Sequence, residues 1–166
     1  MNLSWGISAL LTVGAGIKVS HAIGQQDLLL AKSYVRSGIL ATIIVAIVFY
    51  ILLAISSRYL IGFVRLNNYE IEQSASSYLI WIGISIPFAF QNLFFTNVFI
   101  GYGDSRSPFR INAIAFGLNI LLDPLLIFYT GLGIKGAAIA TILSQVLATI
   151  LFYRKLKIII NFTVYS

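Results

Sequence analysis

Residues 38–57 read GILATIIVAIVFYILLAISS, an unbroken stretch of apolar and small residues without a charge. A bilayer core about 30 Å thick is crossed by a helix of about 20 mainly apolar residues, which matches this length. The many β-branched residues favour a strand in water. In lipid, however, a helix satisfies its own backbone hydrogen bonds, whereas a strand needs a closed barrel. We therefore predict that residues 38–57 form a transmembrane helix.

The rest of the chain repeats this pattern. Its 166 residues are 59% hydrophobic and 10% charged, whereas a soluble domain carries about 25% charged residues. Further spans are predicted at about residues 3–23, 78–100, 111–128 and 136–153. The predicted fold class is an all-α membrane protein, a polytopic bundle of about five transmembrane helices. Residues 1–166 are expected to form a single, partial transmembrane domain.

The composition argues against several function classes. Cysteine is absent and histidine occurs once, so disulfide frameworks, Cys-based zinc sites and Cys nucleophiles are not expected. The loop at residues 101–108 is rich in Gly and Ser but lacks the lysine and the spacing of a P-loop, so a nucleotide site is not expected either. The net charge of +6 comes from short clusters between apolar runs, which indicates membrane orientation and not nucleic-acid binding.

Basic residues set the predicted orientation, because cytoplasmic loops carry an excess of Lys and Arg. Alternate loops place seven basic residues on one side and three, Arg58, Arg65 and Lys135, on the other. We predict that the seven-residue side is cytoplasmic, in a bacterial plasma (inner) membrane. Met1 then lies on the outer side, and because the first span begins almost at Met1, we expect the chain to lack a preceding segment. The seven are Lys32, Arg36, Arg106, Arg110, Arg154, Lys155 and Lys157.

Asp123 is the most informative position, because it lies within an otherwise uncharged run at residues 111–134. An ionised carboxylate at the centre of a membrane helix costs about 2.5–3.5 kcal/mol, so a compensating group is expected. Asn119 lies one turn earlier on the same face. Pro124, which lacks an N–H, is expected to break the helix and to leave the carbonyl of Ile120 without a donor.

Oxygen donors of this kind suit Na⁺, and burial also raises the affinity of a carboxylate for a proton. We interpret Asn119 and Asp123 as a coupling site for Na⁺ or H⁺, with Na⁺ as a candidate metal ion at Asp123. The alternative is that Asp123 pairs only with an Asn or Ser of a neighbouring helix, as intramembrane polar residues do.

The last predicted span carries Thr141, Gln145 and Thr149 at four-residue spacing, so that one face presents hydroxyls and an amide. We expect this stripe to face Asp123 and predict that Thr141 belongs to the coupling site. The alternative is that the stripe, together with neighbouring Gly and Ala residues, forms an ordinary close-packed helix interface.

The span predicted at residues 78–100 carries a polar band after Pro87, which is expected to kink or break it. Broken helices line the substrate sites of many transporters, so the band is interpreted as a substrate path. The alternative is that its amides only form hydrogen bonds between helices. The band consists of Gln91, Asn92, Thr96 and Asn97.

Four stretches, in order along the chain, resemble the multidrug and toxic-compound extrusion family. With a weaker stretch at residues 20–27, the similarity extends over about residues 8–155. The resemblance implies a twelve-helix antiporter of two six-helix lobes. This chain would be helices two to six of the N-terminal lobe, without the first helix and the second lobe. The four stretches are Gly101-Tyr-Gly-Asp-Ser-Arg-Ser-Pro108, Arg110-Ile-Asn112, Asn119-Ile-Leu-Leu-Asp-Pro-Leu-Leu-Ile-Phe128 and Gly131-Leu-Gly-Ile-Lys-Gly-Ala-Ala-Ile-Ala-Thr141.

The resemblance also implies a function: export of xenobiotics or organic cations against inward Na⁺ or H⁺, without enzyme activity and without a further cofactor. Asn119, Asp123 and Thr141 match the cation or proton site of the family's N-terminal lobe. The expected partners are the solute, the lipid bilayer and the missing half of the transporter. One alternative is a lipid-linked oligosaccharide flippase of the same superfamily, which would favour basic residues in its cavity. The other is a truncated membrane protein that does not transport.

Overall fold

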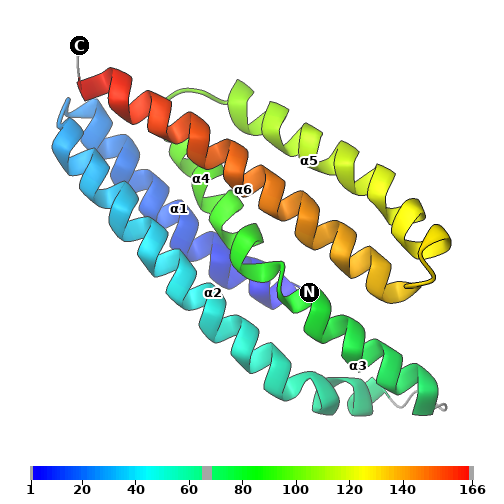
Figure 1. The fold of residues 1–166 in the computed structure, drawn as a ribbon. Helices are drawn as coiled ribbons and strands as arrows, with labels where there is room; N and C mark the ends of the chain where they lie inside the picture. Colours follow the sequence, from blue (N-terminus) through cyan, green and yellow to red (C-terminus); the bar gives the residue numbers. More distant parts are fainter. Residues whose placement is uncertain (1, 65–68, 165–166) are drawn as a thin grey trace.

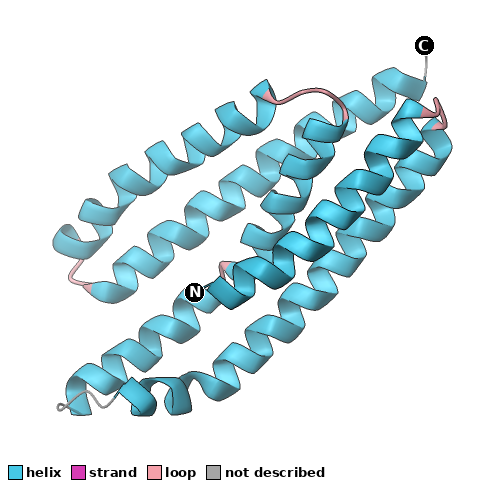
Figure 2. Cartoon of the chain, turned by 180° about the vertical axis from the view of Figure 1, so that it is seen from behind, coloured by secondary structure: helices cyan, strands magenta, loops and turns pink. Residues whose placement is uncertain are grey.

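The computed structural model of the chain describes residues 2–64 and 69–164, and the side chains of residues 12–57 and 73–159. Over these residues it consists of helices joined by short loops, without a strand (Figure 2). The predicted all-α class is therefore confirmed. The elements are α1 (Asn2–Gly24), α2 (Leu28–Val64), α3 (Tyr69–Gly83), α4 (Ile86–Gly101), α5 (Arg106–Pro124), the π-helix η1 (Leu125–Tyr129) and α6 (Ile134–Val164).

Three stretches of the described helices are long and apolar enough to cross a membrane, namely Leu28–Ser57, Arg106–Tyr129 and Ile134–Ile159. A bent pair, Gln73–Gly83 with Ile86–Gly101, makes a fourth when it is counted as one span. The predicted first span falls on α1, whose side chains before residue 12 lie outside the described residues. Helices α2 and α6 extend beyond their predicted apolar cores, and polar and basic residues such as Lys32 and Arg154 lie on these extensions.

The third predicted span is broken in two. Helix α3 ends at Gly83 and α4 begins at Ile86, with a bend of 40° between the two apolar segments. Pro87 lies in the first turn of α4, where its missing N–H costs no helical hydrogen bond. The carbonyl of Ile82, at the break, accepts both the backbone N–H of Ser85 (3.0 Å) and its hydroxyl (2.6 Å).

The helices lie in two groups with α6 between them (Figure 1). Helix α4 packs against α1, α2 and α6, whereas α5 packs mainly on α6 and lies apart from α1 and α2. Most of the apolar surface of α2 points away from the bundle: Ile44, Leu52 and Ile55 are more than half exposed. This outward apolar surface fits a helix whose solvent is lipid.

Aromatic rings of α4 and α6 form the centre of the core. The ring of Phe152 lies 5.9 Å from that of Phe95 and 5.7 Å from that of Phe99, measured between centroids. On the other side of α4, the ring of Phe94 packs directly on the backbone of Gly38 in α2, where an added Cβ would lie 2.4 Å from a ring carbon. The glycine therefore allows α2 and α4 to approach closely.

One end of the bundle gathers the α1–α2 loop, the α4–α5 loop and the end of α6 (Figure 1). We call it the basic end, because the seven basic residues of the predicted cytoplasmic side lie on the segments that meet there. Of the three residues counted for the opposite side, Lys135 lies in the first turn of α6 at the other end. The side chains of Arg58 and Arg65 lie outside the described residues.

Candidate functional site

Asn119 and Asp123 lie one turn apart on α5, and both side chains are half-buried. The amide nitrogen of Asn119 donates to a carboxylate oxygen of Asp123 at 3.5 Å, the outer limit of a hydrogen bond. This contact orients the carboxylate and leaves the amide oxygen of Asn119 able to accept another donor or a cation. The two predicted residues therefore form one polar pair within an otherwise apolar span.

Pro124 changes the helix directly after this pair. The α-helical pattern ends at Pro124, and Leu125–Tyr129 continue as a π-helix, so the span goes on where a break was expected. A π-turn absorbs the missing N–H and the ring of proline without interrupting the helix. At Pro124, the expected break thus takes the form of a change in helix type.

A cavity of about 330 Å³ lies between α4, α5 and α6. It brings together Asn119 and Thr141 of the predicted coupling site with Asn92 and Thr96 of the predicted substrate path. The carboxylate of Asp123 is one turn beyond Asn119 and is not part of the wall. The lining residues are Ala89, Asn92, Leu93, Thr96, Asn112, Ala115, Phe116, Asn119, Thr141, Ser144, Gln145 and Ala148.

The hydroxyl groups in this wall present acceptors to the cavity. Thr141 donates its proton to the carbonyl of Ala137 (3.0 Å), and Thr96 donates to the carbonyl of Asn92 (2.9 Å). Ser144 likewise donates to Ala140 (2.8 Å). Because each hydroxyl has one proton and two lone pairs, all three retain lone pairs for a ligand. The wall is therefore rich in oxygen acceptors, which suits a cation or a solute with N–H donors.

The rest of the α6 stripe does not face Asp123 as expected. The amide nitrogen of Asn92 donates to the side-chain oxygen of Gln145 (2.7 Å) and to its backbone carbonyl (3.0 Å). Thr149 donates to the amide oxygen of Asn92 (2.9 Å). Gln145 and Thr149 thus join α6 to α4, which agrees with the alternative interpretation of the stripe as a helix interface.

Two residues of the predicted substrate path lie away from the cavity. Asn97 donates to the carbonyl of Leu93 (3.1 Å). It also packs against Gly16 of α1, because a Cβ added at Gly16 would lie 2.9 Å from the Cβ of Asn97. Gln91 is buried, and neither its side-chain nitrogen nor its oxygen makes a hydrogen bond among the described residues. The structure therefore assigns Asn92 and Thr96, but not Gln91 and Asn97, to the cavity.

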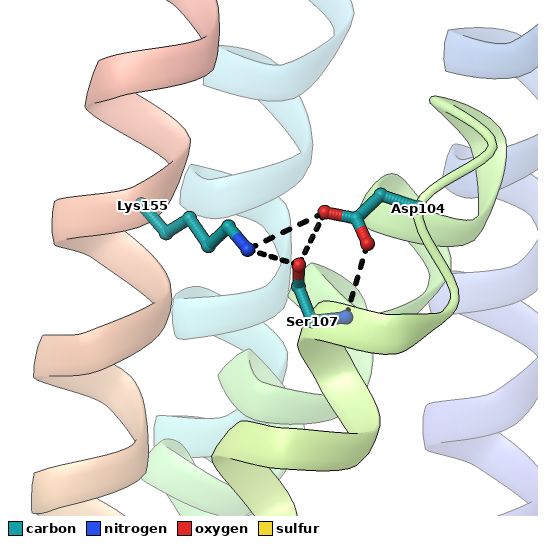
Figure 3. Close-up of polar contacts among 3 residues, drawn as sticks. All are labelled: Asp104, Ser107 and Lys155. Atoms are coloured by element: carbon teal, nitrogen blue, oxygen red, sulfur yellow. Dashed lines mark hydrogen bonds and ion pairs between the residues drawn. The ribbon is translucent and has the colours of Figure 1, made fainter.

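A second polar cluster, not identified from the sequence, lies at the basic end (Figure 3). Asp104 accepts from the backbone N–H of Ser107 (3.0 Å) and from its hydroxyl, which caps the start of α5. Lys155 of α6 lies 3.6 Å from the same carboxylate and also donates to Ser107. The hydrogen bonds from Ser107 and the charge of Lys155 hold the pKa of Asp104 below its usual value. An acidic residue three positions before Ser107 at a helix start was the sequence signal for this cap.

Within the described residues, no three His, Cys, Asp or Glu side chains gather as a metal site. The predicted cation site comprises the carboxylate of Asp123 and the amide of Asn119, which are in contact, and the hydroxyl of Thr141, which lines the same cavity as Asn119. Such a set fits a weakly held hard cation such as Na⁺, which takes oxygen ligands, better than a transition metal.

Known proteins similar to this chain were found among both sequence families and solved structures. The family model described as MatE matches residues 1–125. The probable multidrug resistance protein NorM of Thermotoga maritima is 30% identical over 149 residues, which cover 85% of this chain and 32% of the relative. Protein DETOXIFICATION 43 of Arabidopsis thaliana is 33% identical over 112 residues, 67% of this chain and 21% of the relative. The chain thus spans between about a fifth and a third of the length of these relatives.

Among solved structures, a multidrug resistance MATE family transporter in an inward-facing conformation superposes with a TM-score of 0.82 at 25% identity. The match covers 88% of this chain and 33% of that chain. The helical arrangement described above therefore resembles part of a transporter of known structure.

Proposed function

Because this chain belongs to the MatE family of multidrug and toxic-compound extrusion proteins, we propose that it is part of an antiporter that exports xenobiotics or organic cations. The family consists of integral membrane transporters with several spans, and the chain carries such spans. The inward movement of Na⁺ or H⁺ would drive export, without a further cofactor and without enzymatic chemistry. The proposed location is the plasma (inner) membrane of a bacterium.

The contact between Asn119 and Asp123 beside the cavity is the observation that carries this proposal. A carboxylate within a span is costly unless a positive charge accompanies it. Binding of Na⁺ or H⁺ at Asp123 removes that cost, so the site favours occupancy by one of these ions. The hydroxyl of Thr141, which lines the same cavity as Asn119, would supply a further oxygen ligand from α6.

The cavity indicates the class of solute. Its volume of about 330 Å³ lies within the range of small-molecule sites, about 300–1,000 Å³. Its acceptors, together with Leu93 and Phe116, suit an organic cation that has N–H donors and an apolar body. Protonation or Na⁺ binding at Asp123 would oppose the binding of such a cation nearby, and this competition is what antiport requires.

The flippase alternative receives less support. A cavity for a lipid-linked oligosaccharide phosphate would be lined by basic residues, and no Lys or Arg is among the described residues of this wall. The basic residues lie instead at the basic end, outside the cavity.

The chain covers only part of its relatives, so we propose that further helices, including an acidic first helix and a second lobe, complete the transporter. A hybrid tests both the function and this completion. In the hybrid, residues 1–166 replace the matching stretch of the Thermotoga maritima relative, and ethidium serves as the cationic probe. We expect the hybrid to lower ethidium accumulation in efflux-deficient cells when a Na⁺ or H⁺ gradient is present.

The hybrid with Asp123→Asn should reach the membrane in equal amount and lose this ion-dependent efflux, because the substitution removes the titratable charge at nearly constant volume. Asn112→Asp adds a carboxylate to the cavity wall at another position of α5. Combined with Asp123→Asn, it tests whether ion-dependent efflux requires the carboxylate to be at position 123. Undiminished efflux by the Asp123→Asn hybrid would exclude Asp123 from ion coupling.

A further inference from the structure

Between the cavity and the basic end, α4, α5 and α6 carry buried aromatic and aliphatic side chains. Phe95 and Phe99 of α4 pack against Phe152 of α6, and Ile111 of α5 and Leu156 of α6 belong to the same buried cluster. The cavity residues nearest to this layer are Thr96, Asn112 and Ala148. We call the layer of Phe95, Phe99, Ile111 and Phe152 the aromatic plug.

The cluster of Asp104, Ser107 and Lys155 (Figure 3) belongs to the turns of α5 and α6 next to those that carry the plug. On α5, Ser107 is one turn from Ile111 of the plug, and both are buried. On α6, Lys155 is three residues from Phe152 and so lies on the same face. Cavity, plug and polar cluster therefore follow one another along the two helices.

Helix α5 packs extensively on α6 and only weakly on the other helices. Within the apolar span that α5 begins, only 11% of the residues are buried. Large side chains such as Phe109, Ile120 and Leu121 are exposed. At its start, the contact with Lys155 is the ion pair that joins α5 and its preceding loop to α6.

From this arrangement we propose that Asp104, Ser107 and Lys155 form a latch. The latch holds the start of α5 against α6 and keeps the aromatic plug closed over the cavity. Exchange of solute between the cavity and the side of the membrane at the basic end then requires release of the latch. This inference rests on the cavity and its closure and does not depend on which solute or ion is transported.

The strength of the contact fits a latch that opens. The side chains of Lys155 and Asp104 are 43% and 30% exposed, and exposed ion pairs shift an equilibrium by about a factor of two to five. A deeply buried pair would be much harder to open, because each charge would be left unpaired in a low-dielectric environment. The cap on α5 remains when Lys155 moves away, so α5 can shift as an intact helix.

Thiol labelling of the complete chain in lipid vesicles tests the latch. The chain contains no cysteine, so a Thr96→Cys substitution places a single thiol in the cavity wall. A membrane-impermeant maleimide is added to one face at a time. Ser33→Cys, at an exposed position near the start of α2 at the basic end, identifies which vesicle face carries that end.

Lys155→Met should raise the labelling rate of the cavity thiol about two- to fivefold from the basic end, the range expected for an exposed ion pair. Asp104→Asn, which retains an acceptor for the cap, should give a similar increase. The double variant should exceed neither single variant by much, because both remove one interaction. Lys157→Met is the matched control: it removes the same charge from an exposed position on the same helix and should leave the rate unchanged.

General loosening of the fold is detected by Ala46→Cys, a fully buried position on α2 outside the cavity. Unchanged labelling of the cavity thiol in Lys155→Met would overturn the latch. An increase from both faces, or concurrent labelling at position 46, would also overturn it, because the variant would then have disturbed the whole bundle. The labelling experiment does not require transport of ethidium by the hybrid. The latch and the proposed transport function can therefore be disproved separately.

Discussion

Asn92 of α4 and Gln145 of α6 are joined at two points, since the amide nitrogen of Asn92 donates to the side-chain oxygen of Gln145 at 2.7 Å and to its backbone carbonyl at 3.0 Å. Thr149 completes the arrangement by donating to the oxygen of Asn92. These bonds connect the cavity-lining faces of two helices through residues that are 53 positions apart in sequence.

Asn92→Ala should therefore destabilise the chain. The substitution removes both donors and one acceptor, and hydrogen bonds between membrane helices are worth about 0.6 kcal/mol on average and about 1.7 kcal/mol at most. Thermal unfolding in detergent micelles measures the effect. Asn112→Ala is the control, because it removes an amide from the same cavity wall and leaves these bonds in place. An equal loss of stability in both variants would show that the bonds between Asn92 and α6 do not stabilise the fold.

Gln91→Leu should stabilise the chain. Gln91 is buried with both of its polar side-chain atoms unpaired among the described residues, and a buried unsatisfied polar group costs about 1–3 kcal/mol. Leucine has a similar volume and no polar atom. A lower midpoint of thermal unfolding in Gln91→Leu would mean that the amide has a partner, such as a bound water, that the leucine displaces.

Gly38→Val should disrupt the packing of α2 on α4. A Cβ at Gly38 would lie 2.4 Å from a ring carbon of Phe94, and forced overpacking of a core costs about 1–3 kcal/mol. Gly117→Ala is the comparison, because nothing lies within 4 Å of its added Cβ and alanine favours the helix. We expect a lower unfolding temperature for the first and an equal or higher one for the second.

The contribution of Asp104 to stability should depend on pH. Its pKa is lowered from the ordinary 3.8 by the hydrogen bonds from Ser107 and the charge of Lys155. A carboxylate with a lowered folded-state pKa stabilises the fold above the unfolded pKa, and this contribution is lost as pH falls through the folded value. Asp104→Asn should therefore unfold at a lower temperature than the parent at pH 7, and the difference should shrink below about pH 4. A difference that persists unchanged at pH 3 would contradict this assignment.

Asn119→Leu should weaken the response of the hybrid transporter to its driving ion. The substitution removes the donor that orients Asp123 (3.5 Å) and an oxygen of the cavity wall, but it leaves the carboxylate in place. We expect efflux to require a higher Na⁺ or H⁺ concentration for half-maximal rate, with the maximal rate less affected. An unchanged concentration dependence would assign Asn119 to the wall alone.

The sequence predicts the helical class well, because lipid leaves a long apolar run such as residues 38–57 little choice besides a helix. The Asn119–Asp123 contact was also predictable, since it depends only on four-residue spacing within one helix. The partners of Asn92 could not be predicted, because they depend on how α4 and α6 pack against each other. The ion pair between Lys155 and Asp104 could not be predicted either, because the two residues are distant in sequence and no spacing or composition pattern links them.

Five residues of α5, each four positions after the last, run from Ser107 through Ile111, Ala115 and Asn119 to Asp123. At 1.5 Å per residue this row covers about 24 Å, most of the thickness of a membrane core. A rigid helix transmits a displacement at one end to the other without rearranging the residues between them. Occupancy of a site deep in the bilayer and access at its surface can therefore be linked mechanically by one element, with no relay of side chains.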